Sequence, residues 1–289
     1  MSTTLENNFI SIKINDKGAE LASLYKKENQ TEYLWQADAK FWNRHAPVLF
    51  PIIGKLNNDK TIIKGKECKL GQHGLARDFV HTMIEKSPSH ALFQLKSSDA
   101  TLENYPYEFE LSTEFILVKN SAQITYTVKN PSNENIYFSL GFHPAFNWPI
   151  NPQDKKENYF IEFEHKETAD RIWFDNGFIT GENRPWLKNE NKLNLFDDLF
   201  KDDVLIFKNL KSQKVMLRSK DHQKSVQVDF KDFPYLGIWT KAGNPFICIE
   251  PWFGIADNKN SPRPFVDKEG VQKLAPGNRF ECMITYSIQ

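Results

Sequence analysis

The feature that most constrains the fold is an alternation of apolar and polar residues that recurs along the whole chain. Successive side chains of a β-strand point to opposite faces, so this pattern is typical of strands with one buried and one solvated face. Turn-forming stretches such as Asn15–Gly18 and Asn130–Asn133 separate the runs. The clearest alternating runs are Ile10–Ile14, Tyr107–Leu117, Ile124–Val128, Val226–Phe230 and Phe280–Ile288.

This pattern predicts an all-β protein built as a large antiparallel β-sandwich or a barrel. We expect short helical turns only near Ala37–Trp42 and Leu195–Phe200. The chain has 289 residues, but no linker-like stretch, charge block or fixed-period repeat divides it. All-β domains of about 250 residues are common, so we predict one domain spanning residues 1–289.

Composition argues against several classes of partner and cofactor. Thirty-seven Lys and Arg residues balance thirty-seven Asp and Glu residues, whereas a nucleic-acid binder needs a surplus of positive charge. No apolar run is long enough to span a membrane, and the first residues lack the pattern of a signal peptide. The three cysteines, Cys68, Cys248 and Cys282, cannot all pair and match no zinc spacing. We therefore expect a cytoplasmic protein with reduced thiols and no metal.

Four segments interrupt the alternation, and each carries His, Arg or Glu beside Gly, Pro and aromatic residues. Connections of this kind are where a rigid scaffold usually places its chemistry. The chain contains no glycine-rich phosphate loop, nucleophile elbow or zinc-protease motif, so we expect no cofactor. The four segments are Phe41–Leu56, Leu70–Phe79, Leu140–Pro149 and Phe246–Asp257.

Two residues in these segments are candidates for acid–base chemistry. His143 follows a strand-like run, and an unperturbed imidazole titrates near neutral pH. Glu250 follows the apolar run Phe246–Ile249, where desolvation would raise its pKa toward that of a general base. The alternatives are a histidine packed at a sandwich edge and a carboxylate at a solvated strand end.

The other candidates are ligand-binding groups. His73 lies beside glycine, and Arg77 and Arg44 offer fixed donors for hydroxyls or an anion. The alternatives are an exposed turn with an Arg77–Asp78 salt bridge and a surface charge at Arg44. Asp203 directly precedes the apolar run Val204–Phe207, where a strand-entry turn is the alternative. Tryptophan faces that fit a sugar ring are Trp148, Trp239 and Trp252.

Together these groups suit one reaction on a sugar. A base takes the proton of the anomeric hydroxyl while an acid protonates the ring oxygen. The ring opens, the C1–C2 bond rotates, and closure gives the other anomer without a cofactor. We expect the fold to bring His143 and Glu250 to opposite sides of one pyranose-sized hollow.

Four segments of the chain, taken in sequence order, resemble those of the aldose 1-epimerase (galactose mutarotase-like) family. The resemblance is greater to its LacX-like and hexose-6-phosphate epimerase branches. The resemblance extends from Ile10 to Tyr286 and implies a supersandwich fold with a sugar site on a concave face. It implies that Glu250 is the general base and His143 the general acid. It further implies that His73, Arg44 and Asp203 bind the sugar, with the adjacent Asp202 as the alternative to Asp203. The segments are Arg44–Gly54, His73–Arg77, Gly141–Asn147 and Ile249–Asp257.

The chain departs from the better-known galactose mutarotases, which carry His-Gly-Gly where this chain has His73-Gly74-Leu75-Ala76-Arg77. The sugar-phosphate branch has a similar His-Gly-Leu/Phe-Ala-Arg motif, and Arg44, Arg77 and Lys55 could together hold a phosphate. We therefore expect an aldose 1-epimerase acting on a small-molecule sugar or sugar phosphate, as a monomer or homodimer. The alternatives are a hexose-6-phosphate 1-epimerase, a non-catalytic carbohydrate-binding β-sandwich, and a glycosidase-type domain using Asp203 and Glu250.

Overall fold

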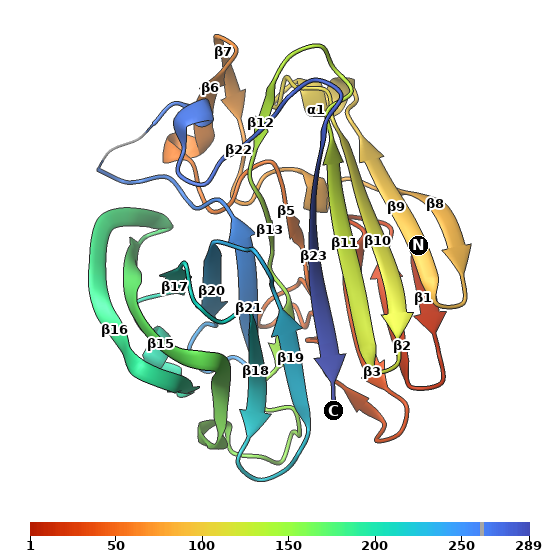
Figure 1. Ribbon diagram of the computed structural model, residues 1–289, viewed down its shortest axis with the longest axis vertical. Coiled ribbons are helices and arrows are strands. Elements are labelled where there is room, and N and C mark those ends of the chain that lie inside the picture. The colour runs from red at the N-terminus through yellow and green to blue at the C-terminus, as the bar shows by residue number, and fades with distance from the viewer. Residues whose placement is uncertain (261–262) are drawn as a thin grey trace.

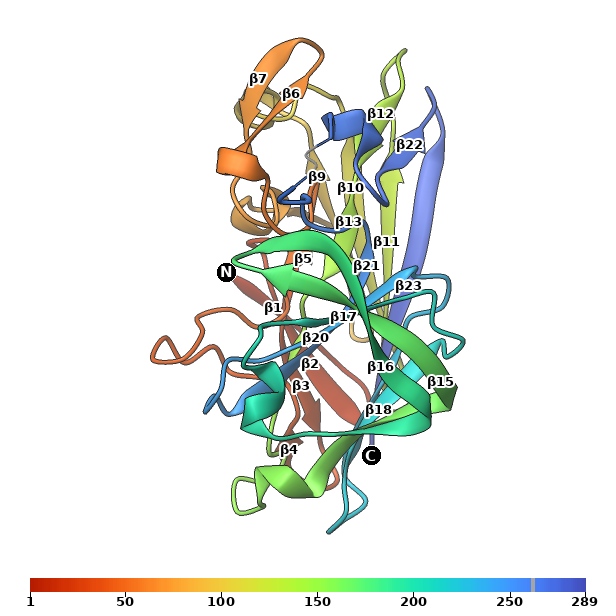
Figure 2. The same cartoon turned by 90° about the vertical axis from the view of Figure 1, so that its left-hand side faces the viewer.

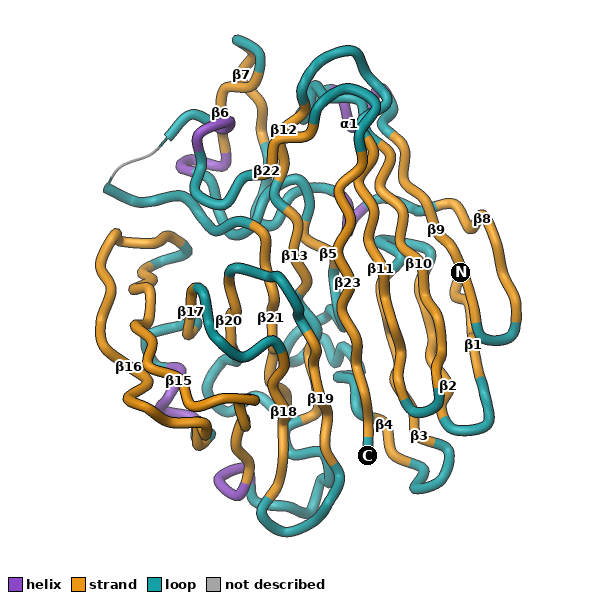
Figure 3. Tube along the Cα trace, viewed as in Figure 1, coloured by secondary structure: helices purple, strands orange, loops and turns teal. Residues whose placement is uncertain are grey.

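A computed structural model of the chain describes residues 1–260 and 263–289. Strands and loops form nearly all of the fold, and the helical segments are short (Figure 3). The predicted all-β class is therefore confirmed. A helical turn forms at Asp197–Phe200, within the predicted stretch, whereas residues 39–41 form a turn and no helix.

Each alternating run in the sequence contributes to a strand. In chain order the strands are β1 (Ser2–Glu6), β2 (Ile10–Asn15), β3 (Glu20–Lys26), β4 (Thr31–Glu32), β5 (Val48–Leu49), β6 (Lys60–Ile63), β7 (Lys66–Lys69), β8 (Thr82–Ser87), β9 (His90–Lys96), β10 (Glu110–Val118), β11 (Ser121–Lys129), β12 (Ile136–Phe138), β13 (Leu140–Phe142), β14 (Ala145–Asn147), β15 (Tyr159–Asp175), β16 (Phe178–Asn194), β17 (Leu205–Lys208), β18 (Lys214–Ser219), β19 (Ser225–Asp229), β20 (Tyr235–Trp239), β21 (Phe246–Phe253), β22 (Gln272–Leu274) and β23 (Arg279–Ile288).

The helical segments are a short α-helix and several 3-10 turns. They are α1 (Asp99–Leu102), η1 (Asn57–Asp59), η2 (Ala76–Asp78), η3 (Lys156–Asn158), η4 (Asp197–Phe200) and η5 (Phe265–Asp267). Among the described residues, no helix has the length and apolar character needed to cross a bilayer.

Antiparallel pairing joins most strands into one large sheet. Within the described residues it has 15 strands, in the order β5-β13-β21-β20-β17-β15-β18-β19-β23-β11-β10-β9-β8, with β14 beside β21 and β16 beside β15. A second sheet has the order β1-β2-β3-β4 and lies behind β8–β11 (Figure 1). The remaining pairs are β12–β22 and β6–β7.

The core forms between these two sheets. Along β10 every second residue is buried, as its alternating sequence predicts. Leu5 and Ile12 of the smaller sheet and Phe93 and Phe115 of the larger sheet are fully buried in the same apolar cluster. The protein is therefore a large antiparallel β-sandwich.

The other half of the large sheet carries a long hairpin that shapes the functional region. Strands β15 and β16 have 17 residues each, and several register irregularities interrupt their pairing. Irregularities of this kind bend a β-ribbon, and the hairpin crosses in front of β17 and β20 (Figure 2). The tip of the hairpin thereby covers one side of the sheet.

Candidate active site

A cavity of about 690 Å³ lies between this hairpin tip, strands β17, β20 and β21, and the irregular segments that interrupt the alternation. Its volume is within the range of about 300–1,000 Å³ that small-molecule sites occupy. The structure brings all seven sequence-predicted site residues to its walls. They are Arg44, His73, Arg77, His143, Asp203, Glu250 and Trp252.

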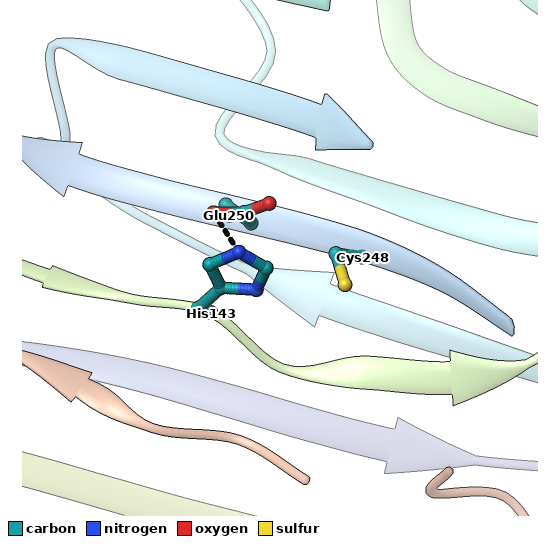
Figure 4. Close-up of side chains that lie close together, drawn as sticks. All are labelled: His143, Cys248 and Glu250. Carbon is teal, nitrogen blue, oxygen red and sulfur yellow. Dashed lines mark ion pairs between the residues drawn. The ribbon is translucent and has the colours of Figure 1, made fainter. Parts of the chain in front are cut away.

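Strand register places His143 beside Glu250. Antiparallel pairing aligns Gly141 with Trp252 and Ala145 with Cys248, so the residue midway between them, His143, faces Glu250. The distance from His143 Nε2 to Glu250 Oε2 is 3.3 Å (Figure 4). The two groups therefore lie on the same wall of the cavity, and the expectation of opposite sides is wrong.

Glu250 lies inside β21 and is 1% exposed, so a solvated strand end is also excluded. Strand β21 pairs with β20 on one side and with β13 and β14 on the other, which removes the carboxyl from water. This burial raises the pKa of Glu250 well above its usual range, and the negative charge of Asp203 adds to the rise. The indole N–H of Trp252 acts in the opposite direction on this pKa.

His143 is also buried, with 8% of its surface exposed. Burial lowers the pKa of its imidazole to about 3; a hydrogen bond to its own backbone opposes the shift, and the positive charge of Arg77 adds to it. Both shifts favour the uncharged form of the pair, with its proton on the Glu250 carboxyl. The pair can become ionic by moving this proton from Glu250 to His143.

A tight turn fixes the first histidine. His73 and Gly74 both have left-handed backbone conformations, with φ of 69° and 74°. A Cβ at Gly74 would lie 2.3 Å from the Phe50 carbonyl oxygen, so only glycine fits this approach. The Gly54 N–H donates to His73 Nδ1 at 3.2 Å, so the proton of the neutral ring is on Nε2, which lies 3.3 Å from the side-chain amide of Gln72.

Burial lowers the pKa of His73 well below its usual range, and the charges of His143 and Arg77 lower it further. The His73 ring meets the His143 ring edge-on, with centroids 5.5 Å apart. His73 is thus a neutral Nε2–H donor beside the His143–Glu250 pair.

The two arginines form a cationic end of the cavity. Arg44 Nη2 donates to Asp78 Oδ1 at 2.6 Å, and Arg77 Nη2 donates to the Gln72 carbonyl oxygen at 2.6 Å. The Arg77–Asp78 ion pair that we considered as an alternative is present at 3.8 Å, so Arg77 both pairs with Asp78 and lines the cavity. The carboxylate of Glu20 accepts two backbone N–H bonds just after Arg44 and anchors that segment.

The acidic and aromatic groups occupy the other walls. Among the described residues it is Asp203, and not Asp202, that lines the cavity. The Trp252 indole lies across two glycines: a Cβ at Gly141 or Gly237 would lie 2.7 or 2.6 Å from its ring atoms.

The three tryptophans proposed to face a sugar do not share one place. Trp239 lines the cavity with Trp252. Trp148 lies outside it, fully buried against Phe200 and beneath the Lys156 ammonium, so its expected place beside a sugar is wrong.

Trp42, Asn176 and Gly177 are among the cavity residues that the sequence reasoning missed. Trp42 lies within a segment that interrupts the alternation, and its indole packs on the His143 ring at 4.9 Å and an interplanar angle of 31°. Asn176 and Gly177 form the hairpin tip, and an Asn-Gly pair is a recognised hairpin-turn signal. Lys55, which the sequence analysis named with the two arginines, packs its aliphatic chain across Gly177 and lines the cavity.

One group of side chains has the composition of a metal site. Ligand atoms of His143, Cys248 and Glu250 lie within 4.8 Å of one another (Figure 4). Burial and the neighbouring Glu250 raise the pKa of the Cys248 thiol well above its usual range. Metal binding requires the thiolate, so this set fits a metal ion poorly.

Comparison with known proteins relates the chain to one family over most of its length. The sequence profile of the aldose 1-epimerase family matches residues 1–261. Protein LacX, plasmid, from Lactococcus lactis subsp. lactis is 35% identical over 287 residues, covering 96% of this chain and 95% of its own.

Two solved structures resemble the whole chain. A galactose mutarotase related enzyme from Lactobacillus acidophilus has a TM-score of 0.96 at 35% identity, covering 100% of this chain and 97% of its own. A galactose mutarotase-like protein from Lactobacillus casei has a TM-score of 0.94 at 33% identity and covers 100% of both chains. With its sandwich fold, its cavity and this likeness over the full length, the chain belongs to the aldose 1-epimerase family.

Proposed function

We propose that the protein interconverts the α and β anomers of an aldose, with Glu250 as general base and His143 as general acid. The contact of 3.3 Å between these buried groups, at the wall of a sugar-sized cavity, carries the proposal. The anomeric oxygen O1 and the ring oxygen O5 are bonded to the same carbon. A base acting on one and an acid acting on the other must therefore be neighbours.

The reaction starts from the ionic form of the pair. The Glu250 carboxylate takes the proton from O1, and the O1–H electron pair forms the C1=O1 double bond. The C1–O5 bond breaks, and O5 takes the proton from the His143 imidazolium. Rotation about C1–C2 presents the other face of the aldehyde, and the reverse proton transfers close the ring. The pair ends with the proton count with which it started, so no cofactor is consumed.

The remaining cavity residues bind and orient the ring. His73 donates a hydrogen bond from Nε2–H to the sugar, and the Asp203 carboxylate accepts hydrogen bonds from sugar hydroxyls beside Glu250. The Trp252 face packs against the C–H face of the pyranose, as aromatic rings commonly do with sugars. These groups hold C1 next to the acid–base pair, and such orientation is a large part of the rate gain in many enzymes.

A phosphorylated aldose is a second candidate, favoured by the position of Arg77. Arg77 lines the cavity together with His143 and His73, and its charge lowers the pKa of both rings. In the proposed pose His143 contacts O5, and C6 is the substituent of C5, the ring carbon bonded to O5 on the side away from C1. Arg77 and Arg44 would then approach a phosphate at C6.

Anomer exchange measured by NMR or polarimetry tests the proposal, with glucose, galactose and their 6-phosphates as substrates. We expect acceleration of at least one aldose, and a loss of about 100-fold to 10,000-fold in Glu250→Gln and in His143→Asn. His81→Asn is the matched control, because His81 is 1% exposed and lies outside the cavity. Full activity in either dyad variant would contradict the assigned roles.

Two further outcomes decide between the alternatives. A rate advantage for the 6-phosphates that disappears in Arg77→Ala and survives in Arg77→Lys would favour the phosphorylated substrate. Saturable sugar binding by calorimetry without any anomer exchange would favour a non-catalytic carbohydrate-binding protein.

A further inference from the structure

Arg171 is a fully buried cation outside the cavity. It lies on β15 and is 0% exposed. Its Nη2 donates to three consecutive backbone carbonyls, those of Asp202, Asp203 and Val204, at 2.5, 3.4 and 3.1 Å. The guanidinium also lies 4.6 Å from the centroid of the Trp173 ring. One side chain therefore holds the backbone of the segment that contains Asp203.

The segment held by Arg171 has an unfavourable backbone conformation. Asp203 has φ of 65°, in the left-handed region that a residue with a Cβ adopts at a cost. Its carboxylate accepts a hydrogen bond from the next backbone N–H, that of Val204, at 2.8 Å. This conformation presents Asp203 and Val204 to the cavity. Because Arg171 contacts the carbonyl oxygens of residues 202–204 together, it favours this left-handed turn over an extended backbone at Asp203.

Fold stability alone gives a poor account of Arg171. Its Nε and Nη1 have no hydrogen-bond partner within the described residues. Burying a guanidinium with two such groups is costly, and an apolar side chain of similar size avoids that cost. The favourable charge–charge contacts of Arg171 are with Asp202 and Asp203, and its guanidinium also lies against the Trp173 and Trp186 rings. Its contribution is therefore concentrated on the Asp203 turn.

We propose that Arg171 is a positioning residue for the sugar site, holding residues 202–204 in the turn that aims the Asp203 carboxylate at the bound sugar beside Glu250. This inference rests on the proposed function, because the consequence of misplacing Asp203 is a loss of sugar orientation. Arg171 itself touches neither the sugar nor the acid–base pair.

The test compares Arg171→Met and Arg171→Lys with the matched control Arg184→Met. Arg184 is exposed, ion-paired with Glu182, and stacked on the same Trp173 ring at 3.5 Å. We measure kcat and KM for anomer exchange, and the sugar Kd from the fluorescence of the cavity tryptophans. We expect Arg171→Met to lower kcat/KM by about 100-fold, Arg171→Lys to lower it less, and Arg184→Met to leave it unchanged.

A double-mutant cycle with Asp203→Asn separates positioning from general support of the fold. Arg171→Met should cost much less in the Asp203→Asn background than in the wild type. A full additive loss in that background, or wild-type kcat/KM in Arg171→Met, would overturn the inference. If Arg171→Met does not fold, the Arg171→Lys cycle gives the same comparison.

Failure of the proposed function gives a different result. In that case the wild-type protein accelerates no aldose. The same cycle is then measured on the sugar Kd, where coupling between Arg171 and Asp203 supports the positioning role and additivity rejects it.

Discussion

Replacing Glu250 by glutamine should lower activity and raise stability, and the two effects have one physical origin. The carboxyl is 1% exposed, and its burial raises its pKa. Glutamine has nearly the same shape but cannot accept the O1 proton. A loss of 100-fold to 10,000-fold corresponds to about 3–5 kcal/mol of transition-state stabilisation.

The stability effect has a defined pH dependence. An unfolded glutamate ionises above about pH 4.5, whereas the folded protein keeps Glu250 protonated to higher pH. Its contribution to stability is fully present below pH 4.5 and is lost as pH rises through the folded pKa. Between these values the loss is about 1.4 kcal/mol per pH unit. Glutamine carries no such loss, so the stability advantage of Glu250→Gln should increase with pH.

The size of the expected shift in Tm follows from the length of the chain. Unfolding entropy is about 2.1 cal/mol/K per residue, so for 289 residues each 1.4 kcal/mol changes Tm by about 2 °C. Thermal melts of wild type and Glu250→Gln between pH 5 and pH 9 would show the difference.

A second buried carboxylate provides the control. Glu167 is 2% exposed, and its carboxylate accepts the N–H and O–H of Ser212 at 2.7 and 2.6 Å. Glu167→Gln removes a satisfied acceptor and should destabilise the protein by about 1–3 kcal/mol without a comparable loss of activity. If Glu250→Gln were destabilising by a similar amount at every pH, Glu250 would be held as an anion and the reasoning would fail.

Three further predictions concern stability and the shape of the site. His81 has a pKa lowered to about 4 by burial, so it contributes stability above pH 6.5 that is lost toward pH 4; His81→Asn should flatten that part of the pH–Tm curve. Gly74→Ala should raise KM, because a Cβ at this position collides with the Phe50 carbonyl and displaces His73. An unchanged KM for anomer exchange would contradict this prediction. Lys268→Met should lower Tm by about 5–8 °C by leaving Asp257 buried without its cation, with partial recovery in Asp257→Leu/Lys268→Met.

The strands could be predicted from the sequence because each needs only a local pattern. The runs around Ile124 and Phe280 became β11 and β23 with the expected faces buried. The environment of Glu250 could not be predicted in this way. In the sequence Glu250 ends an apolar run, and only pairing on both sides of β21 places it inside a strand and away from water. Register between distant strands is a tertiary property.

The choice between Asp202 and Asp203 shows the same limit more sharply. Both residues precede the same apolar run, and no local rule distinguishes them. The left-handed turn at Asp203 and the Arg171 contact, made from a strand about thirty residues earlier, decide which carboxylate faces the cavity. Arg171 had no signal in the sequence, because its partners are backbone carbonyls, which every residue carries.

The charges around the acid–base pair bear directly on the proposed reaction. Asp203 raises the pKa of Glu250 and Arg77 lowers that of His143, so both neighbours add to the effect of burial and favour the uncharged pair. In the proposed mechanism the uncharged pair is the form that accompanies the open-chain sugar, and the ionic pair accompanies the closed ring. Relative to the ionic pair, this environment makes the Glu250 carboxylate a stronger base and the His143 imidazolium a stronger acid, so it favours the proton transfers that open the ring. The resting pair is uncharged as well, so the same environment adds to the cost of forming the ionic pair. The barrier is lowered only by interactions that are stronger in the transition state than in this resting complex.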